Sequence, residues 1–219
     1  MFVPQCGGGM EIFMNIERII NFETDQNCYL VYDDNKVGFL IDPGSRGEEI
    51  SKKIEELGIN LTHILLTHCH YDHIEGLEYL RKKYNAKVTS SFECNKNIQN
   101  VSINLSGLFS DIIKCEPADE IVNDGSILDI GSMRVKAIKT PGHTDGGVCY
   151  LLGEDLFSGD TLFLRNVGRW DFPTGNQNVL IKSIKEKLYT LDDDVIVHPG
   201  HGNDTKIYYE KYYNSFVRE

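Results

Sequence analysis

The sequence predicts an α/β fold built as one domain. Short apolar runs of strand length alternate with amphipathic segments whose apolar residues recur every three or four positions. The 219 residues, 41% of them hydrophobic, suffice for one core, and no linker rich in proline, glycine or serine divides them. We therefore expect a single domain over residues 14–219. Residues 1–13, which include Gly7-Gly8-Gly9, are expected to form an N-terminal extension that is loose or adds only an edge.

The first half of the chain predicts a hairpin followed by alternating helices and strands. Two apolar runs at 27–32 and 37–41 flank a polar turn, which is a hairpin pattern. Residues 48–57 carry apolar side chains at helical spacing and stop at Gly58, which predicts a helix. The same reasoning predicts the next elements, which are a strand at 61–67, a helix at 74–84 and a strand at 86–90.

The second half predicts a similar set of strands and helices after a polar stretch. For residues 91–120 we expect only a surface excursion near the mouth of a site. Short strand patterns return between 121 and 139, with turns at Asp124-Gly125 and Gly131-Ser132. The remaining predicted elements are a strand pair at 148–152 and 156–158, a helix at 178–191, a strand at 195–197 and a terminal helix at 205–216.

Composition excludes several classes of protein. The net charge of −11 argues against a nucleic-acid binder, whose affinity would depend on lysine and arginine contacts to phosphate. It also argues against binding to an anionic membrane surface. No run of about 18 consecutive apolar residues is present, so no membrane span is expected. The first residues lack a basic region followed by an apolar core, so no secretory signal is expected and the predicted location is cytoplasmic.

The cysteines predict a reducing environment. Six are present at irregular spacing, and none forms a C-x-x-C pair. This pattern is poor support for a disulfide framework or a structural zinc ribbon. We therefore expect mostly reduced thiols, as in a cytosolic protein.

A cluster of metal-ligand residues follows the strand predicted at 61–67. The stretch Thr67-His68-Cys69-His70-Tyr71-Asp72-His73 holds three of the seven histidines and an aspartate. Neutral imidazole is the commonest metal ligand in proteins, and carboxylate suits the same cations. In extended backbone His68 and His70 project to the same side, while Cys69 points away and is expected to be buried filler. Asp72 and His73, in the turn before the next helix, can reach a second point nearby.

Three more candidate ligands come from separate segments. His143 and His201 lie in the glycine-flanked loops Pro141-Gly142-His143 and Gly200-His201-Gly202, and Asp160 follows a predicted strand. Seven candidates on four segments, each at a strand end, can build two adjacent metal sites. A carboxylate has two oxygens and can bridge two cations, and Asp160 is the candidate for that role.

Three other polar residues are expected to support the site without binding metal. Asp42 follows the strand at 37–41, and we interpret it as a structural carboxylate that braces the ligand loop through a hydrogen bond. His63 and His198 lie on or beside strands and outside the clusters, so packing or supporting roles are expected for them.

Substrate contacts are predicted in the loop after Asp160. Arg169 could reach a substrate carboxylate, or form a salt bridge with a nearby carboxylate such as Asp171. Trp170, the only tryptophan, could line the pocket or simply pack against the core.

These motifs together resemble the metallo-β-lactamase superfamily. The patterns T-H-x-H-x-D-H, P-G-H-T, S-G-D-T-L-F and P-G-H-G match from about Asn15 to Thr205. Gly159-Asp160-Thr161-Leu162-Phe163 and Gly168-Arg169-Trp170-Asp171 resemble the hydroxyacylglutathione hydrolase (glyoxalase II) group within it. The resemblance implies a four-layer αββα sandwich with metals at one sheet edge. Because the chain ends soon after His201, it looks like the short glyoxalase II-like hydrolases that lack the C-terminal helical domain.

The resemblance also implies how the candidate ligands divide between two divalent metal ions. By motif, one ion is held by His68, His70 and His143, the other by Asp72, His73 and His201, and Asp160 bridges them. Zinc is the expected metal. Iron and manganese stay open, because mixed nitrogen and oxygen ligation does not choose strongly among these ions.

The predicted activity is hydrolysis of a small-molecule thioester or ester. Two neighbouring cations hold a shared hydroxide at neutral pH, because metal binding lowers the pKa of water to roughly 7. That hydroxide attacks a carbonyl, and Asp72 could also orient it. A thiolate leaves readily because a thiol has a pKa of only about 8.5. The resemblance therefore indicates a binuclear hydrolase of thioesters of the S-hydroxyacylglutathione type.

Other functions fit parts of the same pattern. A persulfide dioxygenase of similar fold would hold one iron through His68, His143 and Asp160. A hydrolase of another ester or lactone is a further alternative. β-Lactam hydrolysis is disfavoured because no secretory signal is seen, and a nuclease fits poorly with the acidic charge. A non-catalytic binding module would be expected to have lost ligands, and none is lost. The acyl group, the thiol carrier and the oligomeric state stay open.

Overall fold

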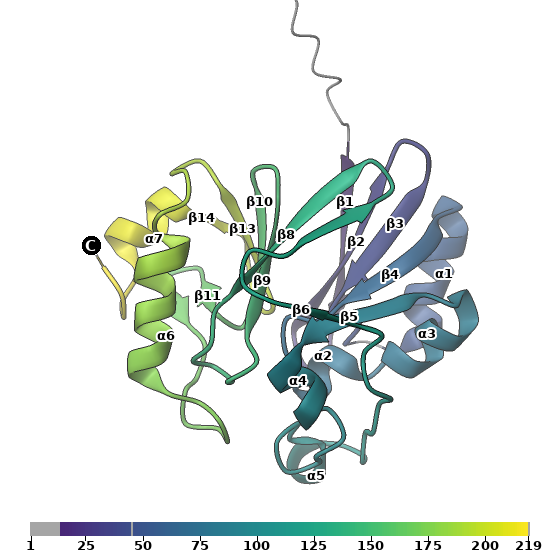
Figure 1. Ribbon diagram of the computed structural model, residues 1–219, viewed down its shortest axis with the longest axis horizontal. Coiled ribbons are helices and arrows are strands. Elements are labelled where there is room, and N and C mark those ends of the chain that lie inside the picture. The colour runs from purple at the N-terminus through teal and green to yellow at the C-terminus, as the bar shows by residue number, and fades with distance from the viewer. Residues whose placement is uncertain (1–13, 45, 219) are drawn as a thin grey trace, which may run out of the picture.

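The computed structural model describes residues 14–44 and 46–218, which form two six-stranded sheets with helices on their outer faces (Figure 1). Helices α1 (Gly47–Leu57) and α3 (Leu77–Tyr84) cover one sheet, while α6 (Gln177–Ser183) and α7 (Ile207–Tyr213) lie beside the other. The predicted four-layer αββα sandwich is therefore confirmed. The predicted extension at 1–13 lies outside the described residues.

The first sheet has the strand order β1-β2-β3-β4-β5-β6. β1, β2 and β3 are antiparallel, whereas β3 to β6 run parallel to one another. The predicted hairpin is confirmed as β2 and β3, but β1 had no clear sequence pattern. The bounds are β1 Met14–Asn21, β2 Gln26–Asp33, β3 Val37–Ile41, β4 Asn60–Leu65, β5 Lys87–Ser91 and β6 Glu120–Val122.

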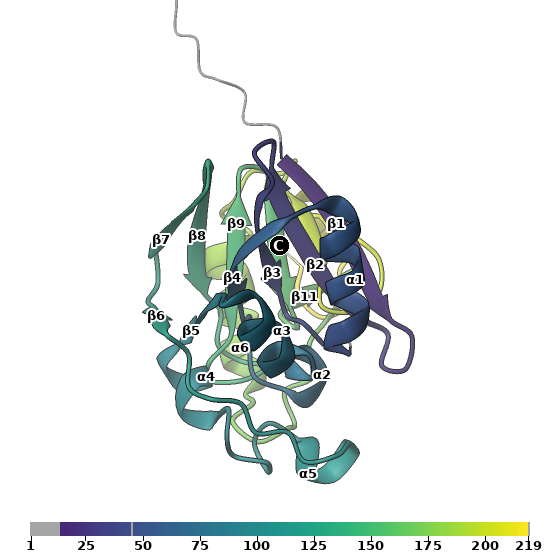
Figure 2. The same cartoon turned by 90° about the vertical axis from the view of Figure 1, so that its right-hand side faces the viewer.

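The helices of the first half follow the apolar spacing with one break. α1 ends at Gly58, which adopts a left-handed φ of 65° that glycine accepts without strain. The helix predicted at 74–84 is divided into α2 (Tyr71–Ile74) and α3. The break occurs because the Gly76 N–H donates to the Pro43 carbonyl at 2.8 Å instead of continuing the helix. Figure 2 shows α1, α2 and α3 together in front of the first sheet.

Residues 91–120 contain two short helices, α4 (Phe92–Asn97) and α5 (Ser106–Phe109), within a largely irregular excursion. α5 protrudes at one end of the molecule in both views (Figures 1 and 2).

The second sheet has the order β14-β13-β10-β9-β8-β7, and only β10 and β13 in it are parallel. A separate hairpin, β11 with β12, follows β10 and was not predicted. The bounds are β7 Ile127–Ile130, β8 Met133–Lys139, β9 Val148–Leu152, β10 Asp155–Gly159, β11 Leu162–Phe163, β12 Asn166–Val167, β13 Ile196–Pro199 and β14 Thr205–Lys206.

The helices of the second half differ from the sequence expectation at their ends. α6 continues into a π-helical segment, η1 (Ile184–Leu188), so the prediction of helix over 178–191 is nearly right. The terminal helix predicted at 205–216 is too long. Thr205 and Lys206 form β14 because they pair with Val197 and Ile196, and the helix ends at Tyr213, after which Asn214 is extended.

Three apolar clusters fill the spaces between the four layers. Side chains alternate across each strand, so Leu30 and Leu40 pack against α1 and α3, while their neighbours Val31 and Phe39 face the second sheet. The third cluster lies between the second sheet and α6 and includes Leu180. In the part of the chain that the structure describes, no helix is both long and apolar enough to span a membrane.

The predicted free thiols are confirmed for the described cysteines. Five of them are buried and unpaired, namely Cys28, Cys69, Cys94, Cys115 and Cys149, whereas Cys6 lies outside the described residues.

Candidate metal centre

The histidine-rich segment leaves the sheet at the carboxyl end of β4 and turns into α2. His70 is extended, with φ −66° and ψ 151°, and immediately precedes α2, whose first turn contains Asp72 and His73. Cys69 is buried in the cluster under α1 and α3. The prediction that Cys69 fills the core is confirmed.

The other candidate ligands meet this segment from the second sheet. His143 follows β8, Asp160 follows β10 and His201 follows β13, so each lies at the end of a strand. The Asn27 N–H donates to the Gly200 carbonyl at 2.7 Å and joins the two sheets beside His201. All seven predicted ligands are therefore brought to one edge of the sandwich.

His68, His70 and His143 form the first group. Each offers a ring nitrogen, and these atoms lie within 4.8 Å of one another. The His143 Nδ1–H donates to the Arg169 carbonyl at 2.7 Å, which leaves Nε2 with a lone pair. That Nε2 lies 2.9 Å from Nδ1 of His70. At this distance the His70 Nδ1–H donates to the lone pair of His143 Nε2, and a divalent cation in place of that proton would be bound by both nitrogens.

Asp72, His73 and His201 form the second group, also within 4.8 Å. The His201 Nδ1–H donates to the Asp25 carbonyl at 3.0 Å, so its Nε2 carries the lone pair that could bind a cation. That Nε2 lies 3.3 Å from Oδ2 of Asp72. This group corresponds to the second set expected from the motifs.

Asp160 lies between the two groups. Its Oδ1 is 3.4 Å from Nε2 of His73 and 3.7 Å from Nε2 of His201. Its Oδ2 is 3.5 Å from Nε2 of His143, on the other side. One oxygen thus faces each group, which is the arrangement needed for a bridging carboxylate.

Asp42 supports the ligand segment. Its Oδ1 accepts the Thr67 N–H at 2.8 Å, and its Oδ2 accepts the Thr67 hydroxyl at 2.5 Å and lies 2.9 Å from Nδ1 of His73. The carboxylate also lies close to His68 and His73 as a third possible donor group. Because both of its oxygens already accept hydrogen bonds, Asp42 braces the histidine-rich segment, as the sequence predicted.

Several buried atoms of the site have no hydrogen-bond partner within the described residues. These atoms are Nε2 of His68, His70 and His73 and Oδ1 of Asp160. Buried polar atoms are nearly always paired, because desolvation of an unpaired group costs free energy. Their concentration here fits a site built to hold cations with nitrogen and oxygen ligands.

Burial sets the protonation of the first group. It lowers the pKa of His68 well below the usual value, that of His70 to about 3, and that of His143 in the same direction. These rings are therefore neutral at physiological pH, which is the form that binds metal.

The second group has a strongly negative field. Burial alone would raise the pKa of Asp160, but His73 and His201 lower it well below its usual range. Burial would lower the pKa of His73, but Asp160, Asp72 and Asp42 raise it. Three carboxylates around one imidazole provide charge that a divalent cation would neutralise.

Gly200 allows the side chains of Asp160 and His73 to lie close to the backbone of the P-G-H-G loop. A Cβ at this position would collide with Oδ1 of Asp160 and lie 2.7 Å from Cε1 of His73. The absence of a side chain in the P-G-H-G motif therefore has a local steric reason.

A cavity of about 400 Å³ opens above the two groups. Leu105 and Phe109 from the 91–120 excursion contribute to its wall, so the predicted position of this segment near the site is confirmed. The lining residues are His70, Tyr71, Asp72, Leu105, Phe109, His143, Asp160, Phe163, Asn166, Val167, Arg169, Phe172 and His201. Sequence reasoning missed Tyr71, Phe163, Asn166, Val167 and Phe172, because no local pattern distinguishes them from packing residues.

The two predicted substrate contacts occupy different places. Arg169 lies on the cavity wall, paired with Asp171 at 2.8 and 2.9 Å and 4.0 Å above the Phe172 ring. Trp170 is absent from the described lining, and its ring packs against Phe216 at 5.9 Å.

His63 and His198 have partners outside the ligand groups. His63 Nδ1 lies 2.9 Å from the Thr62 hydroxyl, and His198 contacts Asp155 at 2.7 Å and Asp204 at 3.3 Å. The prediction that neither histidine is a ligand agrees with this geometry.

Two mixed sheets faced by helices, with histidine and carboxylate groups at one edge, define an α/β sandwich with a candidate metal centre. Residues 22–201 match the model of the metallo-β-lactamase superfamily, and the chain belongs to that superfamily.

Among known relatives, the chain is 36% identical over 208 residues to hydroxyacylglutathione hydrolase GloC of Haemophilus influenzae, covering 93% of this chain and 98% of that one. This relationship supports a metal-dependent hydrolase.

Solved structures give the same fold. The BLEG-1 B3 metallo-β-lactamase has a TM-score of 0.89 at 30% identity, covering 94% of this chain and 100% of its own. ETHE1 from Myxococcus xanthus has a TM-score of 0.77 at 31% identity, covering 93% and 84%. TTHA1623, solved in a di-iron-bound form, has a TM-score of 0.83 at 28% identity, covering 92% and 100%.

Proposed function

We propose that this protein is a two-metal hydrolase of thioesters of the S-hydroxyacylglutathione type. The observation that carries the proposal is the position of Asp160, with one oxygen toward His73 and His201 and the other toward His143. A complete donor group on each side of a shared carboxylate favours two cations over one. The similarity to GloC supports the thioester as substrate.

The residues divide between the cations as the motifs suggest. One cation is held by His68, His70 and His143, the other by Asp72, His73 and His201, and Asp160 is shared. When bound, two divalent ions supply an activated water nucleophile at neutral pH and stabilise the negative charge that develops on the carbonyl oxygen and the leaving thiolate. Zinc is our proposed metal, and the di-iron form of TTHA1623 keeps iron as a second candidate.

The chain's own groups orient the reactants. Asp72 is the proposed catalytic residue, because its carboxylate lines the cavity and can accept a hydrogen bond from the attacking water. Asp42 holds the ring of His73, and the Arg169 carbonyl holds the ring of His143. Fixed rings keep the donor atoms directed at one point, which reduces the reorganisation needed during reaction.

The cavity wall suggests how the substrate is held. Leu105, Phe109 and Phe172 provide apolar surface for the acyl group or for methylene groups of the thiol carrier. Arg169 is the cationic side chain in this wall, and we propose that a substrate carboxylate exchanges with Asp171 as its partner. Trp170 is not proposed as a contact, since its ring packs on Phe216.

Two other activities have specific support and serve as alternatives in the test. The motifs also allow a single-iron persulfide dioxygenase that uses His68, His143 and Asp160, and the fold is shared with ETHE1. The similarity to BLEG-1 favours β-lactam hydrolysis at the same cavity.

Metal content and turnover on one sample distinguish these functions. Protein purified without added metal is analysed for metal per chain, and then assayed with S-lactoylglutathione, with a β-lactam, and for oxygen uptake with glutathione persulfide. About two ions per chain, thioester hydrolysis, and its loss in His70→Ala would support the proposal. His63→Ala serves as the matched control, because the His63 ring pairs with the Thr62 hydroxyl and His63 belongs to none of the candidate ligand groups among the described residues.

Two other results would contradict the proposed thioester hydrolysis. One iron per chain with persulfide-dependent oxygen uptake and no thioester turnover would replace the proposal by the dioxygenase. Two ions with β-lactam turnover but no thioester turnover would keep the hydrolase and change its substrate.

A further inference from the structure

The β11–β12 hairpin forms part of the cavity wall. It lies in the chain between Asp160, which faces both ligand groups, and Arg169, whose carbonyl orients His143. Phe163, Asn166 and Val167 from this hairpin line the cavity. Its position therefore affects both the shape of the cavity and a metal-ligand ring.

The turn of this hairpin is conformationally unusual. Arg165 has a φ of 58°, in the left-handed region that non-glycine residues seldom adopt. Its N–H donates to Oε2 of Glu210 at 2.9 Å, and its carbonyl accepts the Ser215 N–H at 3.3 Å. Both contacts come from α7 and the residues that follow it, so the surroundings hold the turn in this conformation.

Glu210 is the centre of this contact. Its side chain is fully buried on α7. Besides the Arg165 N–H, its carboxylate accepts the Thr205 hydroxyl at 2.6 Å and the Asn214 amide at 2.8 Å. The same Asn214 amide donates to the Asn166 carbonyl at 3.0 Å, which is a second link to the hairpin. A buried carboxylate is stable only when its acceptor capacity is used, so these bonds are strongly interdependent.

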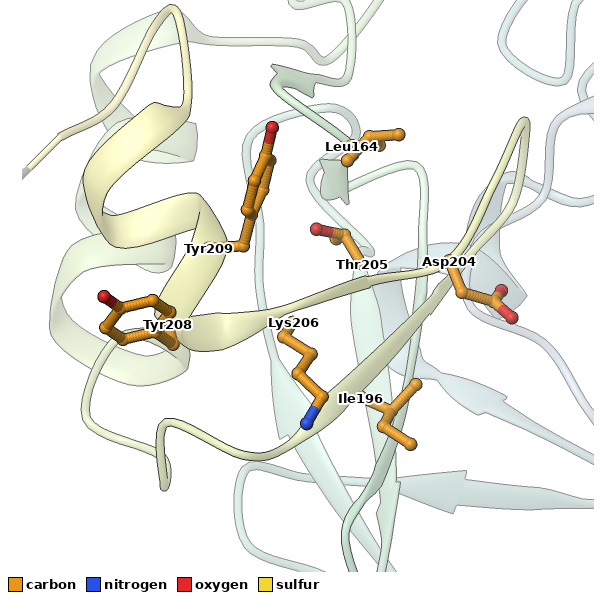
Figure 3. A pocket seen from close by; sticks show the side chains of 7 residues that line it. All are labelled: Leu164, Ile196, Asp204, Thr205, Lys206, Tyr208 and Tyr209. Carbon is orange, nitrogen blue, oxygen red and sulfur yellow. The ribbon is translucent and has the colours of Figure 1, made fainter.

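Apolar packing behind the hairpin is incomplete. A hollow of about 470 Å³ lies between Leu164, at the hairpin tip, and the segment containing Thr205 and Tyr209 (Figure 3). Leu164 itself is 39% exposed. Leu162 and Val167 pack in the third apolar cluster and hold one face of the hairpin, whereas its turn, beside the hollow, is held by the hydrogen bonds to Glu210 and Asn214.

We propose that Glu210 is a positioning residue for substrate binding, which holds the β11–β12 hairpin so that Phe163, Asn166 and Val167 shape the cavity. This inference rests on the proposed thioester hydrolysis for its kinetic readout. It assigns a role to α7, which the sequence predicted only as a terminal helix.

The test compares Glu210→Gln with the parent in metal content, steady-state kinetics and amide hydrogen exchange. Glutamine has the same size but no charge. Its NH2 group faces either the Arg165 and Asn214 donors, which breaks those bonds, or the Thr205 hydroxyl, which can reverse and accept. In the second case the remaining oxygen holds the hairpin without the charge of a carboxylate, so the bonds to the hairpin are weakened in either orientation. We expect unchanged metal content, kcat within about twofold and KM raised about tenfold, because binding is weakened and the reacting groups are not. We also expect faster exchange over residues 162–168.

Asp33→Asn is the matched control. Asp33 is also a buried carboxylate, which accepts the Val37 N–H and the Ser132 N–H and hydroxyl, but it is the last residue of β2, before the turn into β3, and is not among the described residues that line the cavity. The control should lose stability without a change in KM or in hairpin exchange.

Each remaining outcome has a defined meaning. A folded Glu210→Gln variant with parental KM and parental exchange would overturn the proposal, and so would an equal rise of KM in Asp33→Asn. If the parent does not hydrolyse thioesters, the proposed function fails, while the exchange comparison still decides the role of Glu210. If Glu210→Gln does not fold, Thr205→Val, which removes one donor to the same carboxylate, is judged by the same criteria.

Discussion

Nδ1 of His73 lies 2.9 Å from Oδ2 of Asp42, and both side chains are buried. This contact directs Nε2 of His73 toward Asp160. It also links His73 to Thr67, whose N–H and hydroxyl donate to the same carboxylate. A carboxylate that fixes the ring of a metal-ligand histidine contributes to metal affinity without touching the metal.

Asp42→Asn is expected to weaken binding of the cation held by His73. An asparagine retains one acceptor oxygen but places an amide group where the carboxylate accepted hydrogen bonds, so the His73 ring loses its fixed orientation. Affinity should fall roughly 10- to 100-fold, measured by metal titration of chelator-treated protein. Asp33→Asn, at the opposite end of the sheet, should bind metal as the parent does. Equal affinities in Asp42→Asn and the parent would contradict this role.

Removal of metal should lower stability. A cation that binds only the folded chain stabilises it by about 2.7 kcal/mol at a free concentration 100 times its dissociation constant. We expect a lower melting temperature after chelation and recovery when zinc is restored. His63→Ala should show the same difference as the parent, whereas His70→Ala should show a smaller one. Identical melting curves with and without metal would mean that the seven residues do not form a metal centre.

Gly200→Ala should disturb the site through a steric clash. The added Cβ would meet Oδ1 of Asp160 and the ring of His73. Overpacking of this kind costs about 1–3 kcal/mol, and we expect at least about a tenfold loss of metal affinity because both contacted side chains are predicted ligands. Equilibrium metal titration measures this loss of metal affinity.

Gly125→Ala is the control for backbone strain. Gly125 has a φ of 80°, and a Cβ added there would have no described heavy atom beyond its chain neighbours within 4 Å, so alanine is strained without a steric clash. It should lose roughly 1–2 kcal/mol of stability and no metal affinity. If Gly125→Ala loses affinity as Gly200→Ala does, the steric explanation is wrong.

The sequence predicted the elements whose signals are local. The apolar runs at 27–32 and 37–41 around a polar turn matched a real hairpin, and helical spacing stopped by Gly58 matched α1. The candidate ligands were visible because their residue types cluster at strand ends. Each of these features depends on a few neighbouring residues.

Features set by distant contacts were not predictable. The break at Gly76 depends on a bond to Pro43, and β14 exists because Thr205 pairs with Val197. The His201 ring is oriented by the carbonyl of Asp25, a contact across 176 positions of the chain. No local pattern carries such information, so supporting contacts are harder to predict than ligands.

The stability of the protein should fall between pH 6.5 and 9 because of His198. Burial alone would lower the pKa of His198, but its contacts with Asp155 and Asp204 outweigh burial and raise the pKa to about 9. The folded state therefore binds this proton more tightly than the unfolded state. The contribution is fully present below about pH 6.5 and is lost as the pH rises through about 9, and it amounts to at most about 3 kcal/mol.

Denaturant unfolding of the parent and His198→Asn at several values between pH 6 and 9 measures this effect. Both proteins are kept in chelator so that metal release does not contribute. Other groups titrate equally in the two proteins, so the difference in unfolding free energy isolates His198. We expect the parent to be more stable than the variant at pH 6 and the difference to shrink steadily toward pH 9. A difference that does not change with pH would show that the pKa of His198 is the same in the folded and the unfolded protein, so that Asp155 and Asp204 do not hold a proton on it.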